Sequence, residues 1–104
     1  MPHQNETASL AFVGTGGRGR GLLGQLLQMP DVSIPALCDL DDEALEKAQD
    51  MVEDSGRDRP EGYEDHRLLL ERDDVQGVIV ATPWRLHTRI AIDVMEAGKY
   101  AAPE

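Results

Sequence analysis

The chain has 104 residues, enough for one compact domain, and its 20 acidic against 10 basic residues give a formal net charge of −10. This acidity argues against nucleic acid and against anionic membrane surfaces as partners, because both are bound through basic faces. Apolar residues make up 40% of the chain and aromatic residues only 4%, so the predicted core is aliphatic, which suits a helix-covered parallel sheet.

The first predicted elements are a strand, a glycine-rich turn and a helix. Residues 1–9 are polar and are expected to form a flexible lead-in rather than a targeting signal. Residues 10–13 are short and apolar, as in a buried strand, and a glycine cluster follows them. After the glycines, leucines recur at helical spacing as far as Pro30, which is expected to close the helix.

A second strand is predicted at residues 32–38 and a second helix after it. Pro35 removes one donor from the strand, which a sheet tolerates near an end or an edge. Asp41 is the expected N-cap of the helix and Gly56 its expected stop. One apolar stripe is expected on this helix: Ala44, Leu45, Ala48, Met51 and Val52.

A loop and a short helix are predicted next. Residues 57–62 are polar and contain a proline, so they are expected to form a loop. Residues 65–72 are expected to form a short helix that presents Leu68 and Leu69 to the core.

The last elements are a strand, a helix and the start of another strand. Residues 77–81 are short and β-branched, the clearest strand signal in the chain, and residues 100–102 are the expected start of one more. Residues 86–97 are expected to form a helix capped by Gly98. Its predicted inward side chains are Ile90, Ala91, Val94 and Met95.

The resulting order, β-α-β-α-α-β-α-β, predicts a doubly wound, Rossmann-like parallel sheet in three α/β/α layers. We expect the strands at residues 10–13, 33–38 and 77–81 to be parallel neighbours, with the first in the middle. Residues 10–104 are the predicted domain.

The glycine turn has the residues that bind a dinucleotide. Gly14 allows a tight turn out of the strand, Gly16 lets a pyrophosphate approach the backbone amides, and Gly19 allows close packing of helix on strand. Gly17 adds pliability to the turn. Arg18 is a candidate phosphate contact, with a solvated side chain at a helix start as the alternative.

Asp39 is the candidate ligand of the adenosine ribose. It follows the second strand and lies twenty residues after Gly19, the spacing of the carboxylate that bonds the ribose hydroxyls. The alternative is an aspartate that merely ends a strand. Asp41 and Asp42 crowd the same corner and would repel a 2′-phosphate, so NAD is the expected cofactor and NADP the less favoured one.

The remaining candidates for chemistry have structural explanations. Cys38 is the only cysteine, which excludes an intrachain disulfide, favours the cytoplasm and makes a small core residue its expected role. No histidine groups with carboxylates at metal-ligand spacing, so no metal site is expected. His87 is expected to cap or pack against its helix rather than carry protons.

Four ordered motifs resemble the Gfo/Idh/MocA family, the glucose–fructose oxidoreductase and inositol dehydrogenase group. They are Gly-Thr-Gly-Gly-Arg-Gly at 14–19, Cys-Asp-Leu-Asp at 38–41, Ala-Thr-Pro-Trp-Arg-Leu-His at 81–87 and Glu-Ala-Gly-Lys-Tyr at 96–100. The resemblance implies an NAD(P)-binding Rossmann domain, followed by an α/β domain that holds a sugar or polyol-like substrate. It also implies that Ala81, Thr82 and Pro83 lie beside the cofactor.

Two departures limit what the resemblance implies. Trp84 stands where the family commonly has asparagine, and this variant resembles the branch that contains NAD-dependent glycosidases. The family's catalytic lysine follows a glutamate that matches Glu104, so no catalytic residue is assigned here and these residues alone are expected to be inactive. A stand-alone NAD(H)-sensing module and a methyltransferase-like fold remain alternatives, and the oligomeric state stays open.

Overall fold

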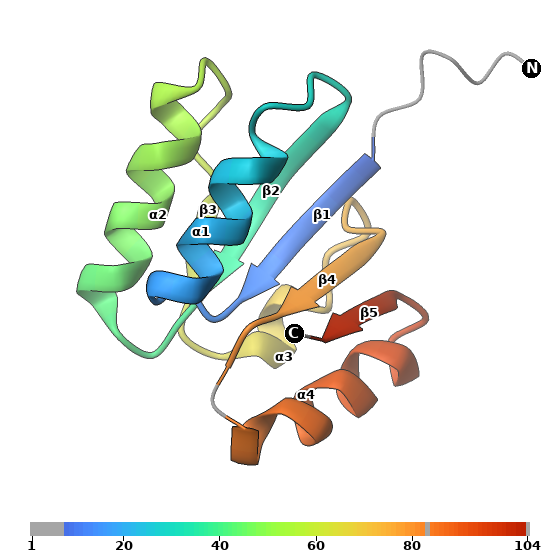
Figure 1. Ribbon diagram of the computed structural model, residues 1–104. Coiled ribbons are helices and arrows are strands. Elements are labelled where there is room, and N and C mark those ends of the chain that lie inside the picture. The colour runs from blue at the N-terminus through green and yellow to red at the C-terminus, as the bar shows by residue number, and fades with distance from the viewer. Residues whose placement is uncertain (1–7, 83, 104) are drawn as a thin grey trace, which may run out of the picture.

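The computed structural model describes residues 8–82 and 84–103, and for Arg18, Pro103 and residues 84–87 the backbone only. One sheet of five parallel strands has the order β3-β2-β1-β4-β5, with β1 in the middle (Figure 1). This confirms the predicted fold class and the predicted arrangement of the three main strands. The strands are β1 (Ala8–Val13), β2 (Val32–Cys38), β3 (Glu61–Tyr63), β4 (Gly77–Val80) and β5 (Tyr100–Pro103).

Helices cover both faces of the sheet. They are α1 (Gly17–Leu26), α2 (Asp42–Asp54), α3 (His66–Leu69) and α4 (Trp84–Glu96), with α1 and α2 on one face and α3 and α4 on the other (Figure 1). Phe12 of β1 packs in the aliphatic cluster with α1 and α2, while Ala11 and Val13 pack in the cluster with α3 and α4. The alternation of side chains along a strand therefore supplies both cores.

Pro35 lies in β2 just before the residues that pair with β3, so its missing donor has to be accommodated against β1. The register of β1 against β2 shifts here, from Ser9 opposite Ser33 to Ala11 opposite Ala36, so β2 has one extra residue. A bulge of this kind leaves one residue unpaired and moves the following side chains to the opposite face. Ile34 and Leu37 consequently face the same cluster despite their odd spacing.

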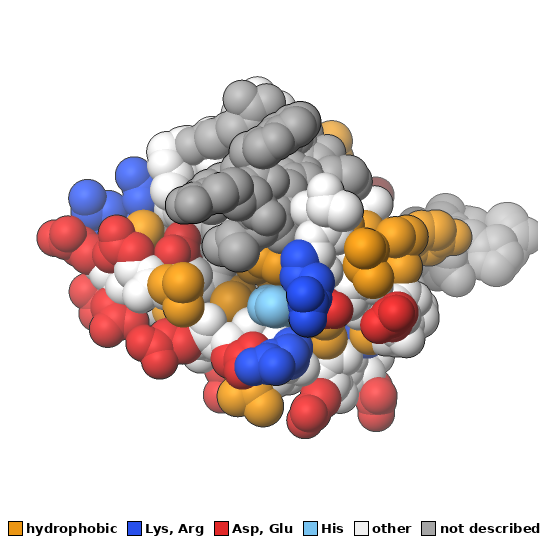
Figure 2. Space-filling view, turned by 90° about the horizontal axis from the view of Figure 1, so that it is seen from below, with side chains coloured by type: hydrophobic (Ala, Val, Ile, Leu, Met, Phe, Trp, Pro, Cys, Tyr) orange, Lys and Arg blue, Asp and Glu red, His pale blue; other side chains and the backbone are white. Residues whose placement is uncertain are grey.

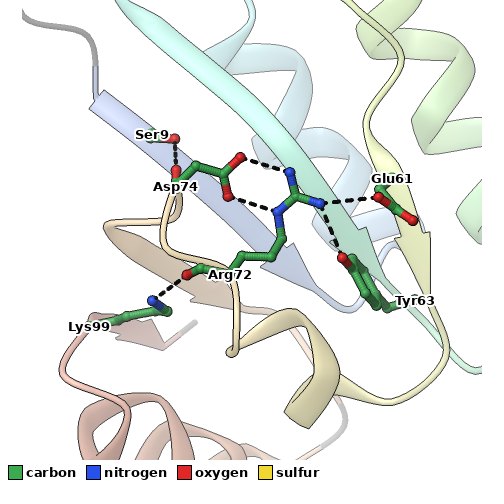
Figure 3. Close-up of polar contacts among 6 residues, drawn as sticks. All are labelled: Ser9, Glu61, Tyr63, Arg72, Asp74 and Lys99. Atoms are coloured by element: carbon green, nitrogen blue, oxygen red, sulfur yellow. Dashed lines mark hydrogen bonds and ion pairs between the residues drawn. The ribbon is translucent and has the colours of Figure 1, made fainter.

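β3 overlaps the end of the segment that the sequence predicts as a loop, so that prediction is wrong at residues 61–62. Three residues of β3 pair with residues 36–38 of β2. Arg72 fastens the strand from outside the sheet: its guanidinium donates to the Tyr63 hydroxyl at 3.1 Å and to the Glu61 carboxylate at 3.3 Å (Figure 3). It is held in turn by both oxygens of Asp74, at 2.8 and 2.7 Å. These contacts raise the pKa of Arg72 further, chiefly through the Asp74 carboxylate.

The sequence predicts the caps of α2 and the glycine that follows α4 correctly, but it is wrong about two of the side chains that it places in the core. The Asp41 carboxylate caps α2 by accepting from two backbone N–H groups, and Gly56 and Gly98 follow their helices with φ of +96° and +79°. The sequence predicts that Met95 faces inward, but 58% of it is exposed, because it lies beyond the edge of the stripe that contacts the sheet. Leu68 is likewise exposed, whereas Leu69 and the following Leu70 fill the core there.

β1 begins at Ala8, two residues before the predicted start, and residues 1–7 of the expected lead-in lie outside the described residues. No helix in the described parts of the chain is long and apolar enough to cross a membrane.

Candidate cofactor-binding site

The carboxyl ends of β1, β2 and β4 surround a hollow of about 1090 Å³. Ligands of open parallel sheets bind at this edge, beside the strand where the order reverses, which here is β1. Figure 2 shows this end of the molecule, where basic side chains (blue) lie beside a histidine (pale blue) and acidic side chains (red) lie around them. The predicted site residues that line the hollow are Gly14, Gly16, Gly17, Gly19, Asp39, Ala81 and Thr82.

Gly14 is held between two neighbouring strand ends. Its N–H donates to the Cys38 carbonyl at 2.8 Å, and its φ of +102° is one that side chains rarely adopt. A Cβ at Gly14 would lie 2.5 Å from the Ala81 carbonyl oxygen. The turn out of β1 therefore requires glycine for backbone conformation and for space.

Gly19 and Gly16 differ in what surrounds them. A Cβ at Gly19 would collide with the Gly14 carbonyl, because α1 packs directly on the turn. A Cβ at Gly16 or Gly17, by contrast, would have nothing within 4 Å, so these two glycines face open space. Gly16 is the N-cap of α1 and the first turn of the helix contains no acidic residue. The first amides of α1 are thus available to an anion.

Asp39 is fixed opposite this turn. Its Oδ2 accepts from the Thr15 backbone N–H at 2.6 Å and from the Thr15 hydroxyl at 2.9 Å, and its Oδ1 accepts from the Asp41 N–H at 2.9 Å. Arg20 donates to the Thr15 carbonyl at 3.1 Å. Arg20 is therefore a support of the turn, and the carboxylate and the glycine turn form one hydrogen-bonded unit.

The far wall of the hollow comes from α3 and α4. His66 Nε2 lies 2.8 Å from Asp93 Oδ2, and Arg89 approaches the same carboxylate at 3.9 Å. The sequence indicates no role for His66, and no local pattern could have indicated one, since its partner lies 27 residues away on another helix.

Two ionisable groups near this wall, the Cys38 thiol and the Asp65 carboxyl, have shifted pKa values. Burial raises the pKa of Cys38 to about 12, and the Asp39 and Asp65 carboxylates contribute to the same shift. The thiol is thus a protonated core group, as expected. The Arg67 side chain, bonded to Asp65, lowers the pKa of that exposed carboxyl.

The segment after β4 completes the site. The Ala81 N–H donates to the Val13 carbonyl at 2.8 Å, which ties this segment to the end of β1. The Thr82 hydroxyl oxygen is buried and has no hydrogen-bond partner among the described residues, so a polar group can still be added there. Pro83 lies outside the described residues, as do the side chains of Arg18, Trp84 and His87.

Two other kinds of site are less well supported. A second hollow of about 1070 Å³ lies around the amino end of β2, but its arginines, Arg57, Arg59 and Arg72, already donate to oxygens of the chain. In the described residues, no three histidine, cysteine or acidic side chains are grouped to hold a metal ion.

Comparison with known proteins agrees with this site. The model of an oxidoreductase family with an NAD-binding Rossmann fold, Gfo/Idh/MocA, matches residues 8–102. A glycosyl hydrolase family 109 protein of Saccharopolyspora erythraea is 38% identical in an alignment 104 residues long that covers 96% of this chain and 23% of that protein. An alpha-N-acetylgalactosaminidase of Bacteroides fragilis is 40% identical in an alignment 98 residues long that covers 91% of this chain and 23% of that protein.

A solved structure is also similar. The WlbA dehydrogenase of Chromobacterium violaceum, in complex with NADH and UDP-GlcNAcA, superposes with a TM-score of 0.82 at 28% identity, covering 96% of this chain and 28% of that one. The chain therefore spans about a quarter of the length of the proteins it resembles. A methyltransferase-like fold, the third sequence-based alternative, is replaced by the family match.

Proposed function

We propose a function from the premise that the chain belongs to the Gfo/Idh/MocA oxidoreductase family as an NAD-binding Rossmann domain: it holds NAD for hydride transfer with a sugar- or polyol-like substrate. One observation carries the proposal. Gly16 and Gly17, with open space at their Cβ positions, line the same hollow as the fixed carboxylate of Asp39, which suits a pyrophosphate joined to a ribose.

Each part of the cofactor has a proposed partner. Gly16 and Gly17 offer backbone N–H groups to the pyrophosphate, and Arg18 adds its charge. Gly14 and Gly19 shape the turn, since a Cβ at either position would collide with the backbone of Ala81 or of Gly14.

The nicotinamide half is assigned to the segment after β4. Ala81, Thr82 and Pro83 form its proposed edge, and the unpartnered Thr82 hydroxyl, which lies among the described residues, supports this because it can bond a polar group of the ligand. Bound NAD would supply the hydride acceptor, and this chain supplies position and orientation.

NAD is proposed as the preferred form of the cofactor. Asp39 and Asp41 both line the hollow at the end of β2, so a 2′-phosphate at a ribose bound there would meet two carboxylates. The 2′-hydroxyl of NAD meets a carboxylate that can accept its proton in a hydrogen bond.

Titration of both cofactors tests the proposal. We expect wild type to bind NAD more tightly than NADP, and Asp39→Ala to weaken NAD binding by roughly tenfold to a hundredfold, the effect of about 1.5–3 kcal/mol for a hydrogen bond to a charged group. Asp54→Ala is the matched control, since it removes the same charge at the exposed end of α2, outside the hollow. Equal affinity of wild type for the two cofactors would contradict the assignment.

A second function is favoured by the relatives. Both curated relatives named above are described as glycosidases, and Trp84 follows the Ala-Thr-Pro motif as in that branch. NAD-dependent glycoside hydrolysis is therefore the alternative to net oxidation. Assays of the full gene product, whatever follows residue 104, decide between them: release of nitrophenol from a nitrophenyl N-acetylgalactosaminide without net NADH supports hydrolysis, and stoichiometric NADH with a free sugar supports oxidation.

The remaining proposals concern boundaries and place. Residues 10–104 are proposed as the cofactor domain, with the two preceding residues of β1 as its edge. The cytoplasm is the proposed compartment, because a buried, unpaired cysteine suits a reducing environment.

A further inference from the structure

Thr15 is the one polar residue in the described part of the chain that is buried as a whole, with 1% of its surface exposed. It occupies the middle of the Gly-Thr-Gly turn, a position to which the dinucleotide motif assigns no residue type. Its backbone N–H and its hydroxyl both point at one oxygen, Asp39 Oδ2, at 2.6 and 2.9 Å. A side chain that only filled space would not need the hydroxyl.

The two contacts decide which oxygen of Asp39 remains free. A carboxylate has about four acceptor positions, two on each oxygen. Among the described residues, Oδ2 accepts from both groups of Thr15, and Oδ1 accepts from the Asp41 N–H, at 2.9 Å. The vacant position is thus on Oδ1.

Thr15 is itself held in place from the other side. Its carbonyl accepts from the Arg20 guanidinium at 3.1 Å, and the preceding Gly14 is locked between β1, β2 and the Ala81 carbonyl. Rotation of the Asp39 carboxylate would break both hydrogen bonds to Thr15, because the turn that contains Thr15 is held in place and cannot move with the carboxylate. The orientation is therefore fixed before any ligand arrives, which lowers the entropic cost of binding.

We propose that Thr15 is a positioning residue that turns the Asp39 carboxylate so that Oδ1 accepts the 2′-hydroxyl of the adenosine ribose. This inference rests on the proposed cofactor function. It adds a determinant of ribose recognition that acts through Asp39 and does not touch the ligand.

The test compares two ligands that differ by that hydroxyl alone, ADP and 2′-deoxy-ADP, by calorimetric titration of the 104-residue chain. Wild type is expected to prefer ADP, and Asp39→Ala to abolish the preference. Thr15→Val keeps the volume and the backbone donor but removes the hydroxyl, and is expected to reduce the preference by roughly threefold to tenfold, the range for one neutral hydrogen bond. Thr15→Ser restores the hydroxyl and is expected to restore the preference.

Two controls separate positioning from stability. Ser55→Ala removes a hydroxyl that donates to the Val52 carbonyl at 2.6 Å, away from the hollow, and should leave the preference unchanged. The preference is a ratio measured on one protein, so a partly destabilised variant changes both affinities together. Thr15→Ala provides a second removal of the hydroxyl if the valine variant does not fold.

The outcomes are distinguishable. A wild-type preference that Asp39→Ala removes and that Thr15→Val leaves intact overturns the role of Thr15 while the proposed function stands. Failure of wild type to bind either nucleotide contradicts the proposed function and this inference with it. Loss of the preference in Thr15→Val, with rescue by serine, supports both.

Discussion

Three glycines of the turn should respond differently to the same substitution. In the structure, a Cβ at Gly14 lies 2.5 Å from the Ala81 carbonyl oxygen at a φ of +102°, and a Cβ at Gly19 meets the Gly14 carbonyl. At Gly16, where φ is −70°, the same atom meets nothing within 4 Å. Alanine at Gly14 or Gly19 is therefore expected to damage the fold, and alanine at Gly16 only the ligand site.

The magnitudes follow from these geometries. A residue with a side chain at the Gly14 φ costs about 1–2 kcal/mol, and forcing the two backbones apart adds about 1–3 kcal/mol. Since 1 kcal/mol lowers the melting temperature of a domain of this size by roughly 4–8 °C, Gly14→Ala should melt at least about 8 °C below wild type. Gly16→Ala should stay within about 1 kcal/mol of wild type, but its methyl group occupies the space in front of the first α1 amides. One lost amide–phosphate bond weakens NAD binding by roughly tenfold or more.

Two measurements on the same samples check this: thermal unfolding by circular dichroism and NAD titration by calorimetry. Gly21→Ala is the control, since Gly21 lies on α1 with open space around its Cβ position and outside the hollow. Wild-type NAD affinity in Gly16→Ala would refute the placement of the pyrophosphate. Wild-type stability in Gly14→Ala would refute the close approach of β1 and β4 ends.

The other predictions concern stability, the thiol and catalysis. Arg57→Ala removes the donors to three backbone carbonyls between residues 27 and 32, and should lower the free energy of unfolding in urea by about 2–4 kcal/mol. Arg59→Ala loses only exposed ion pairs and should leave the urea midpoint almost unchanged. Equal effects of the two substitutions would contradict the structural role of Arg57. Because burial raises the pKa of Cys38 to about 12, a thiol reagent at pH 8 should label it only in denaturant, and rapid labelling of the native chain would contradict its burial. The 104-residue chain should bind NAD without producing NADH from polyols or sugars, because hydride transfer also needs a substrate held in reactive geometry, which the family assigns to a following domain. Turnover by the chain alone would contradict this prediction and would make His87 the candidate for proton transfer.

The site was predictable where its signals are local. The glycines of the turn lie within a run of six residues, and Asp39 follows a strand that its apolar sequence identifies. The rule that parallel strands end at one edge then brings the two together without any structural information. Asp41 is recognisable as a cap for the same reason, since its partners are the next residues of the helix.

The unpredicted features depend on partners distant in sequence. β3 has three residues and a glycine at its centre, too few for a periodic signal, and Arg72 holds it from nine residues away or more. The bulge at Pro35 appears only when β2 is aligned with β1. The Thr15–Asp39 contact spans 24 residues, so the sequence placed both groups in one region but could not show which atoms meet.

The charge of the whole chain sets a condition on how the site works. A formal charge of −10 repels an anionic pyrophosphate at long range, so the field of the protein cannot be what draws the cofactor in. The attraction has to act within a few ångströms, where the first amides of α1 carry partial positive charge and the first turn contains no acidic side chain. One explanation then accounts for the distribution of carboxylates in the hollow. The phosphate end has none in the first turn of α1, so it does not repel the pyrophosphate. The ribose end has carboxylates around Asp39, which accept hydroxyl protons in hydrogen bonds and exclude a further phosphate.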